Sequence, residues 1–170
     1  KGTPASTNIP GARAAAANWT DLSGNLWLFG GVSSTGPLND LWKFDGTNWT
    51  WVSGNSTVKG LGSYGTQGVS APGNVPGARS GAAAWVDSTG RLYLFGGNGM
   101  AESGTAIALM NDLWRFDPQT GEWTWLSGSK TAKAVGVYGT KGLASSSNVP
   151  GARLDASAWT GRDGMLWLFG

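Results

Sequence analysis

The sequence contains no cysteine and no histidine among its 170 residues. Without these side chains it has no Ser-His or Cys-His catalytic unit, and it lacks the usual ligands of protein zinc and copper sites. Disulfides are excluded as well, but a large β-protein does not need them for secretion, so this absence leaves the compartment open. We therefore expect no metal site and no cofactor within this sequence.

Charge and long apolar runs are also scarce. Charged residues make up 13% of the chain, and the 12 basic and 10 acidic side chains are scattered singly, so we do not expect a nucleic-acid partner. No apolar run approaches the ~18 residues that a membrane-spanning helix needs. What is abundant is glycine, with 29 residues, and tryptophan, with 11. This turn-rich and aromatic-rich composition favours an all-β fold.

A twelve-residue string with the core PGAR occurs three times, as NIPGARAAAANW, NVPGARSGAAAW and NVPGARLDASAW. It ends at Trp19, Trp85 and Trp159, so successive copies are 66 (from 19 to 85) and 74 (from 85 to 159) residues apart. Further blocks follow in a fixed order: NLWLFGG, RLYLFGG and MLWLFG, then NDLWKFD and NDLWRFD, then NWTWVSG and EWTWLSG. The chain is therefore built from repeats.

Each block has the pattern of a short strand. LWLF is a continuous apolar run, as in a strand buried on both faces, whereas LWKFD and WTWVS alternate. Hairpin turns rich in Asp, Gly, Asn and Pro separate the blocks. Four antiparallel strands in each repeat, with the repeats side by side, predict the blades of a β-propeller.

The third copy ends at Gly170, which corresponds to Gly30 in the first, and so it lacks the outer two strands. We expect two complete blades plus the inner two strands of a third, all in one propeller domain that belongs to a longer chain or is completed by other chains. Residues 1–74 hold the first blade with its long connection, 75–148 the second with its connection, and 149–170 the inner half of the third.

The order of these blocks resembles the kelch motif. Its marks are a small-residue strand after an arginine, a second strand that ends in Gly-Gly, NDLW-x-F-D, and a last strand led by tryptophan. The closest resemblance is to bacterial kelch-type repeats with the pattern WTWVSG…YGT-x-G…N-x-PGAR. The repeats here exceed the ~50 residues of a kelch repeat, mostly in the connection that follows the fourth strand. The resemblance implies a propeller like that of galactose oxidase, but the copper site of that enzyme uses Tyr, His and a Cys crosslink, of which only Tyr occurs here.

Most recurrent residues are predicted to be structural. Close packing of blades would leave no room for a side chain at the glycine pairs Gly30, Gly31, Gly96 and Gly97. A tryptophan that recurs at each equivalent position favours packing between blades over a sugar-stacking platform, and we expect the outer-strand tryptophans to be buried. These positions include Trp19, Trp85, Trp159, Trp51 and Trp125. Tyr64 and Tyr138 are expected to pin the long connection onto a blade.

Two groups of residues are candidates for binding. Arg13, Arg79 and Arg153 lead into the innermost strands, where they would line a channel mouth and bind carboxylates, or would pair with a nearby Asp or backbone carbonyl. The second group lies in the loop 97–112, which is six residues longer than its counterpart 31–40. We expect its apolar side chains Met100, Ile107 and Leu109 to form an exposed contact surface, with folding back onto a neighbour as the alternative.

The function that these observations favour is a non-catalytic binding or structural module that presents loops to a protein or glycan partner. The low charge, the high content of Gly, Ser, Thr and Asn, and the resemblance to secreted bacterial kelch proteins favour an extracellular or cell-surface location. Two alternatives stay open. The segment belongs to a larger enzyme whose catalytic residues lie elsewhere, or it is the repeating subunit of an extracellular fibre, with identical copies as its partners.

Overall fold

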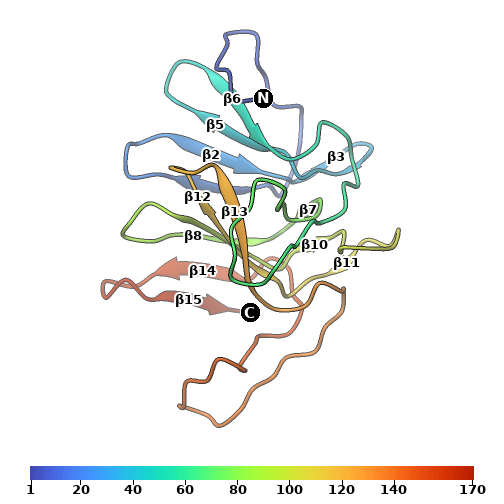
Figure 1. Cartoon of the computed structure of the whole chain (residues 1–170), viewed down its shortest axis with the longest axis vertical. Coiled ribbons are helices and arrows are strands. Elements are labelled where there is room, and N and C mark those ends of the chain that lie inside the picture. The colour runs from blue at the N-terminus through green and yellow to red at the C-terminus, as the bar shows by residue number, and fades with distance from the viewer.

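The computed structural model describes residues 1–170 and contains strands and loops only. Two four-stranded antiparallel sheets form complete blades, and the third copy contributes a two-stranded sheet (Figure 1). The first blade has the order β1-β2-β5-β6, with β1 (Ala17–Thr20), β2 (Leu26–Phe29), β5 (Leu41–Phe44) and β6 (Trp49–Ser53). The second blade has the order β8-β9-β12-β13, with β8 (Ala83–Val86), β9 (Leu92–Phe95), β12 (Leu113–Asp117) and β13 (Glu122–Ser127). The third copy consists of β14 (Ser157–Thr160) and β15 (Leu166–Phe169). The predicted all-β architecture is confirmed, and no helix is long and apolar enough to cross a membrane.

The first strand of each repeat lies innermost. Strand β8 packs beside both β1 and β14, so the first strands of the three repeats lie next to one another. Within a blade, each strand pairs with the next one outward, for example Trp19 of β1 opposite Trp27 of β2. The hairpin turns on one rim and the longer loops on the other rim are consequences of this up-and-down order.

The loops that join the second and third strands carry short sheets of their own. In the first blade, β3 (Val32–Ser33) and β4 (Gly36–Pro37) form a two-stranded hairpin. In the second blade, β10 (Asn98–Gly99) pairs with β11 (Ala108–Leu109) and with β7 (Arg79–Ser80). Figure 1 shows β3, β10 and β11 on the same side of the molecule. Both loops therefore project from one rim.

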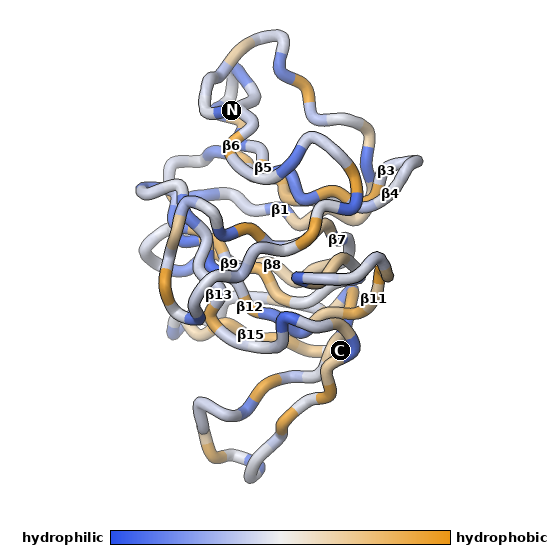
Figure 2. Tube along the Cα trace, turned by 45° about the vertical axis from the view of Figure 1, so that its right-hand side comes forward, coloured by the Kyte–Doolittle hydropathy of each residue, from blue (hydrophilic) through white to orange (hydrophobic).

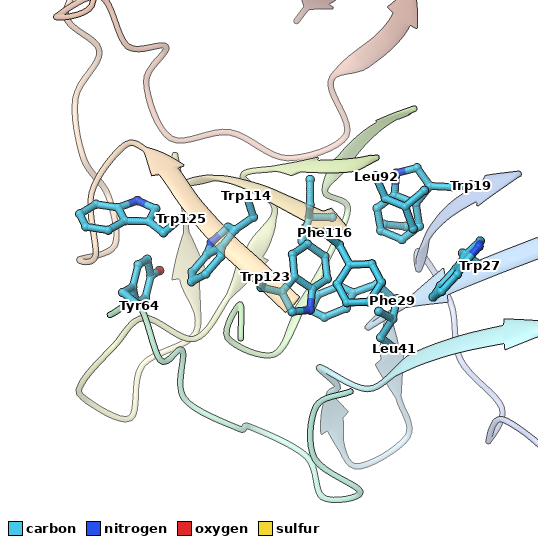
Figure 3. Packing of buried hydrophobic residues seen from close by; sticks show 12 residues of the cluster. Trp19, Trp27, Phe29, Leu41, Tyr64, Leu92, Trp114, Phe116, Trp123 and Trp125 are labelled. Atoms are coloured by element: carbon cyan, nitrogen blue, oxygen red, sulfur yellow. The ribbon is translucent and has the colours of Figure 1, made fainter. Parts of the chain in front are cut away.

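The main hydrophobic core lies between the first two blades. Trp27 of β2 contacts Phe116 of β12 with ring centroids 5.5 Å apart, and Phe29 contacts Trp123 of β13 at 5.4 Å (Figure 3). The second cluster, around Trp85, is smaller and extends toward β14 and β15. Aromatic side chains from neighbouring sheets thus interdigitate to join the blades.

The tryptophan at the end of each PGAR string makes a hydrogen bond from one blade to the next. Trp19 Nε1 donates to the carbonyl oxygen of Tyr93 at 3.0 Å, and Trp85 Nε1 donates to that of Trp167 at 2.8 Å. Trp159, in the third copy, has no such partner and is 48% exposed. These bonds join neighbouring blades, which is the packing role expected for a tryptophan that recurs at equivalent positions.

The glycine pairs make backbone hydrogen bonds between neighbouring blades. Gly31 N–H donates to the carbonyl oxygen of Arg79 at 2.8 Å, and Gly97 N–H donates to that of Arg153, also at 2.8 Å. Gly30 has φ +64°, and a Cβ atom there would lie 2.6 Å from the Arg79 carbonyl oxygen. A side chain would therefore separate the blades as well as strain the backbone.

One expectation for the outer strands is wrong. Trp125 of β13 is buried, as expected, but its counterpart Trp51 of β6 is only half-buried. The reason is that the side chain of Tyr64 packs against Trp125, whereas a cavity borders Trp51.

Candidate functional site

The connection between β6 and β7 is tied to the second blade by Tyr64, which is 1% exposed. Its ring contacts Trp114 and Trp125 with centroids 4.8 and 5.4 Å away (Figure 3). Its hydroxyl donates a hydrogen bond of 2.6 Å to Oδ2 of Asp112. Tyr64 therefore pins the connection onto a blade, and that blade is the next one along the chain.

Asp112 is the centre of a buried polar network. Arg79 donates to both of its carboxylate oxygens, at 2.6 and 2.8 Å, and Trp114 Nε1 donates at 2.7 Å. The Arg79 and Asp112 side chains are both 0% exposed. The first blade repeats the pair, with Arg13 donating to both oxygens of Asp40 at 2.6 and 2.8 Å. Such two-pronged bonds fix the geometry of the buried charges.

Electrostatics keep the network charged. Burial by itself would raise the pKa of Asp112, but the positive charge of Arg79 and hydrogen bonds from Arg79, Tyr64 and Trp114 hold that pKa below its usual value. Burial and the negative charge of Asp112 raise the pKa of the Tyr64 hydroxyl far above its ordinary value. At neutral pH the network therefore consists of a carboxylate, a guanidinium and a neutral phenol.

The PGAR arginines take the paired alternative and do not form an open channel mouth. The guanidinium groups of Arg13 and Arg79 are held by Asp40 and Asp112 and are not free to bind a ligand carboxylate. Arg153 is half-buried and donates to the carbonyl oxygens of Gly151 and Gly170. In the two complete blades, the arginine of the PGAR string therefore pairs with the aspartate of the NDLW block in the same blade.

The long loop 97–112 does not expose all three of its expected contact residues. Met100 is 3% exposed, so its predicted exposure is wrong, and Leu109 is half-buried. The cause is that β10 pairs with both β11 and β7, and Met100 N–H donates to the Ala78 carbonyl oxygen at 2.8 Å. The base of the loop folds back, and Ile107, at 42%, is the predicted residue that stays exposed.

The tip of the loop, residues 102–107, projects from this rigid base. All six residues are exposed. At one end, Glu102 is joined to Lys130 of the next connection by an ion pair of 3.2 Å and by a backbone hydrogen bond of 3.1 Å. The tip is thus an accessible segment held at both ends, the arrangement expected of a pre-organised contact loop. The chain holds no group of three or more acidic side chains placed to bind a metal ion.

Comparison with known proteins agrees with this architecture. The family described as the KLHDC2/KLHL20/DRC7 kelch-repeats domain matches residues 2–134. The chain belongs to the kelch-repeat family. A fungal alcohol oxidase of the AA5 family, solved in complex with copper, has a similar fold, with a TM-score of 0.51 and 14% identity over 92% of this chain and 27% of the oxidase. That similarity shows the shared kelch-type fold alone.

Two curated bacterial proteins also resemble this kelch chain. Both are N-acetylneuraminate epimerases, one from Yersinia pestis (strain Pestoides F) and one from Yersinia pseudotuberculosis serotype O:1b (strain IP 31758). Each is 37% identical over 68 residues, which cover 39% of this chain and 17% of the epimerase. The match therefore spans about a sixth of each relative's length.

Proposed function

We propose that this chain is a non-catalytic kelch binding module whose contact region is the loop tip 102–107 of the second blade, and that its partner is a protein outside the cell. One observation carries the proposal. The inserted loop combines an exposed tip with a base buried to 3% exposure at Met100 and 0% at Met110. A loop kept only for stability would bury its apolar tip, whereas Ile107 stays accessible at 42%.

Membership in the kelch family supports a binding role, because a propeller is a rigid frame that presents loops at its rims. The two loops that project from the same rim differ in length. The longer one places the exposed Ile107 in its tip, whereas the exposed apolar residue of the shorter one, Val32, lies in strand β3. Exposed apolar side chains on ordered loops are typical anchors of protein interfaces.

The test compares two single substitutions on the full chain. Peptides are first selected from a random display library for binding to the unmodified protein, and their affinities for Ile107→Ser and Leu22→Ser are then measured. Leu22 is the matched control, since it is a 70% exposed apolar residue on a hairpin turn between β1 and β2. We expect Ile107→Ser to weaken binding by about tenfold, or about 1.4 kcal/mol, and Leu22→Ser to have no effect. Peptides that bind both variants equally would show that the loop tip is not the contact region.

A second candidate is that this chain is the propeller part of a larger enzyme. The similarity to two enzymes named for a sugar acid favours it. Titration with N-acetylneuraminate, followed by ligand-observed NMR, separates the two functions. Saturable binding of the sugar acid, unaffected by Ile107→Ser, would favour the enzyme part over the protein-binding loop.

A further inference from the structure

A cavity of about 300 Å³ lies between the first two blades, on the rim that carries the hairpin turns. Three turns line it, those between β1 and β2, between β8 and β9, and between β12 and β13. The first two of these turns lie on the left of Figure 1, opposite β10 and β11, and Figure 2 shows hydrophilic residues along them. The cavity is therefore on the other side of the molecule from the loop tip 102–107, and both blades that flank it are complete.

The turns around this cavity depart from the repeat. The position of Arg91 is occupied by Asn25 in the first copy and by Met165 in the third. The turn between the third and fourth strands comprises residues 46–48 in the first blade and 118–122 in the second, so the second is two residues longer. A residue that the blade fold requires recurs at equivalent positions. The arginine and the longer turn differ between two complete blades, so the fold does not require them.

Arg91 and Asp117 form a partly exposed ion pair in the wall of the cavity. Arg91 Nε donates to Oδ2 of Asp117 at 3.3 Å, and the two side chains are 40% and 25% exposed. The Nη1 and Nη2 atoms of Arg91 make no hydrogen bond within the chain. The Gln119 N–H, 2.9 Å from Oδ1, and the bond from Arg91 hold the pKa of Asp117 below its ordinary value. At neutral pH this wall therefore presents free guanidinium donors beside an ionised carboxylate acceptor.

Hydrogen bonds within the turns fix the positions of these groups. On the first-blade side, Asp21 accepts bonds from the Ser23 N–H at 2.9 Å and from Trp27 Nε1 at 2.8 Å, so its carboxylate is engaged by its own hairpin. On the second-blade side, Asp87 holds the Arg91 N–H at 3.0 Å. The Ser23 hydroxyl makes no hydrogen bond within the chain and borders the cavity. The free donors and the acceptor are thus presented by rigid turns from two blades.

The free groups fit a small neutral ligand that is rich in hydroxyl groups. Arg91 and Ser23 can donate and Asp117 can accept, so two adjacent hydroxyls of one ligand each find a partner. Two carboxylates and one guanidinium in the walls leave a net charge of −1, which disfavours an anion, while the guanidinium disfavours a cation. The volume is at the lower end of the ~300–1,000 Å³ of small-molecule pockets, which suits a single sugar ring.

We propose that the cavity bordered by Ser23, Arg91 and Asp117 is a binding site for a neutral monosaccharide. The guanidinium of Arg91 donates to one hydroxyl oxygen, the carboxylate of Asp117 accepts from the neighbouring hydroxyl, and Ser23 holds the ring from the first blade. The site is open to water and has no aromatic wall, so we expect a Kd on the order of 1 mM. It is separate from the loop tip 102–107, so either proposal can fail alone.

Matched neutral and charged sugars test the class of ligand. Glucose, galactose, mannose and N-acetylglucosamine are titrated separately into the unmodified chain, with glucuronate, galacturonate, glucosamine and galactosamine as the charged probes. We expect at least one neutral sugar to bind saturably and to shift the Arg91 Nε–H resonance in NMR spectra. Its acidic and amino forms should bind at least threefold more weakly. Absence of binding by all four neutral sugars, or tighter binding of a charged form, would overturn the proposal.

Substitutions test the site with the sugar that binds most tightly. Arg91→Asn introduces the residue of the first copy, so the turn should keep its fold, and the Kd should rise at least tenfold. Lys59→Asn is the matched control, because it also replaces an exposed cation by Asn, lies on the other rim, and has φ +58°, which Asn tolerates. Its Kd should be unchanged.

Ser23→Ala tests the wall contributed by the first blade, and it does so without changing any charge. We expect it to raise the Kd about threefold, since one hydrogen bond to the ligand is lost. Unchanged affinity in Arg91→Asn or in Ser23→Ala, or equal losses in Arg91→Asn and Lys59→Asn, would show that the sugar binds elsewhere.

Discussion

At the scale of single residues, Tyr64 and Tyr138 show how the same local sequence acquires different roles. Both stand in a Tyr-Gly-Thr segment, yet Tyr64 is 1% exposed and Tyr138 is 81% exposed. The difference comes from the blade that follows. The second blade supplies Asp112, Trp114 and Trp125, whereas the third copy has only β14 and β15. Burial of a tyrosine is therefore decided by a distant strand pair and not by its neighbours in sequence.

Replacing Tyr64 by Phe should reduce the free energy of unfolding by about 1.5–3 kcal/mol, the range for a hydrogen bond to a charged group. Tyr138→Phe is the control and should leave it unchanged, because that hydroxyl is in solvent. Chemical denaturation of the two variants measures both values. Equal stability of the two would mean that the Tyr64–Asp112 bond contributes nothing to folding.

The same network sets the pH range of maximal stability. The pKa of Asp112 is lowered in the folded chain, so its contribution is present above the unfolded value of ~3.9 and is lost as the pH falls through the folded pKa. The pKa of Tyr64 is raised, so its contribution is present below ~10 and declines as the pH rises beyond that value. The pKa values of Asp21 and Asp87 are lowered as well, so these residues add to the loss of stability at acidic pH. In the denaturation series the alkaline loss should shrink in Tyr64→Phe and persist in Tyr138→Phe.

At the scale of elements, the connection that precedes each complete blade covers the outer edge of that blade. Gly68 N–H and Asn74 Nδ2 donate to the carbonyl oxygens of Trp125 and Trp123, at 2.8 and 3.1 Å. Residues Gly2 and Asn8 do the same for β6 of the first blade, on Trp51 and Trp49. An uncovered edge strand is a template for pairing with other chains. The connection occupies the outer edge of the blade, so that edge is not available for such pairing.

Asn74→Ala should cost about 1–3 kcal/mol of unfolding free energy, since it leaves the Trp123 carbonyl without this donor. Asn148 is the matched position in the next connection, where the side-chain amide bonds only to the Leu143 carbonyl oxygen. Asn148→Ala should therefore have a much smaller effect in the same thermal unfolding measurement. A similar loss of unfolding free energy in both variants would indicate that this asparagine stabilises its own turn and does not stabilise the edge of the blade.

Strands and their order follow from the sequence because alternation, apolar runs and turn residues are local signals. The positions of Met100 and Trp51 do not, because each depends on what a distant segment does. Met100 is buried since β10 pairs with β7 of the preceding connection. Trp125 is buried and Trp51 half-buried, since the ring that covers Trp125 belongs to Tyr64 of the connection that precedes its blade. Recurrence across copies identified the arginine, glycine and tryptophan positions, but the Arg79–Asp112–Tyr64 contacts join three separate blocks and have no local signature.

At the scale of the whole molecule, the third copy exposes an apolar surface within residues 1–170. Trp159 and Trp167 stack on each other with centroids 6.1 Å apart and are 48% and 49% exposed, while Phe169 is 73% exposed. Within residues 1–170, strand β15 pairs with β14, whereas the equivalent β2 and β9 each have a partner on both sides. Adjacent aromatic side chains beside an open strand edge favour association with a further strand pair.

We therefore expect a protein that consists of residues 1–170 alone to associate in a concentration-dependent manner through β15. Sedimentation velocity of Phe169→Lys should show a shift toward monomer, because the charge is costly to bury and disfavours edge pairing. Leu22→Lys, at a 70% exposed apolar position on a hairpin turn, should not change the distribution. Since the contact is apolar, association should persist at high salt and strengthen in sulfate, unlike one held by surface ion pairs. A monodisperse monomer at all concentrations, or equal association of both lysine variants, would show that the protein of residues 1–170 does not associate through β15.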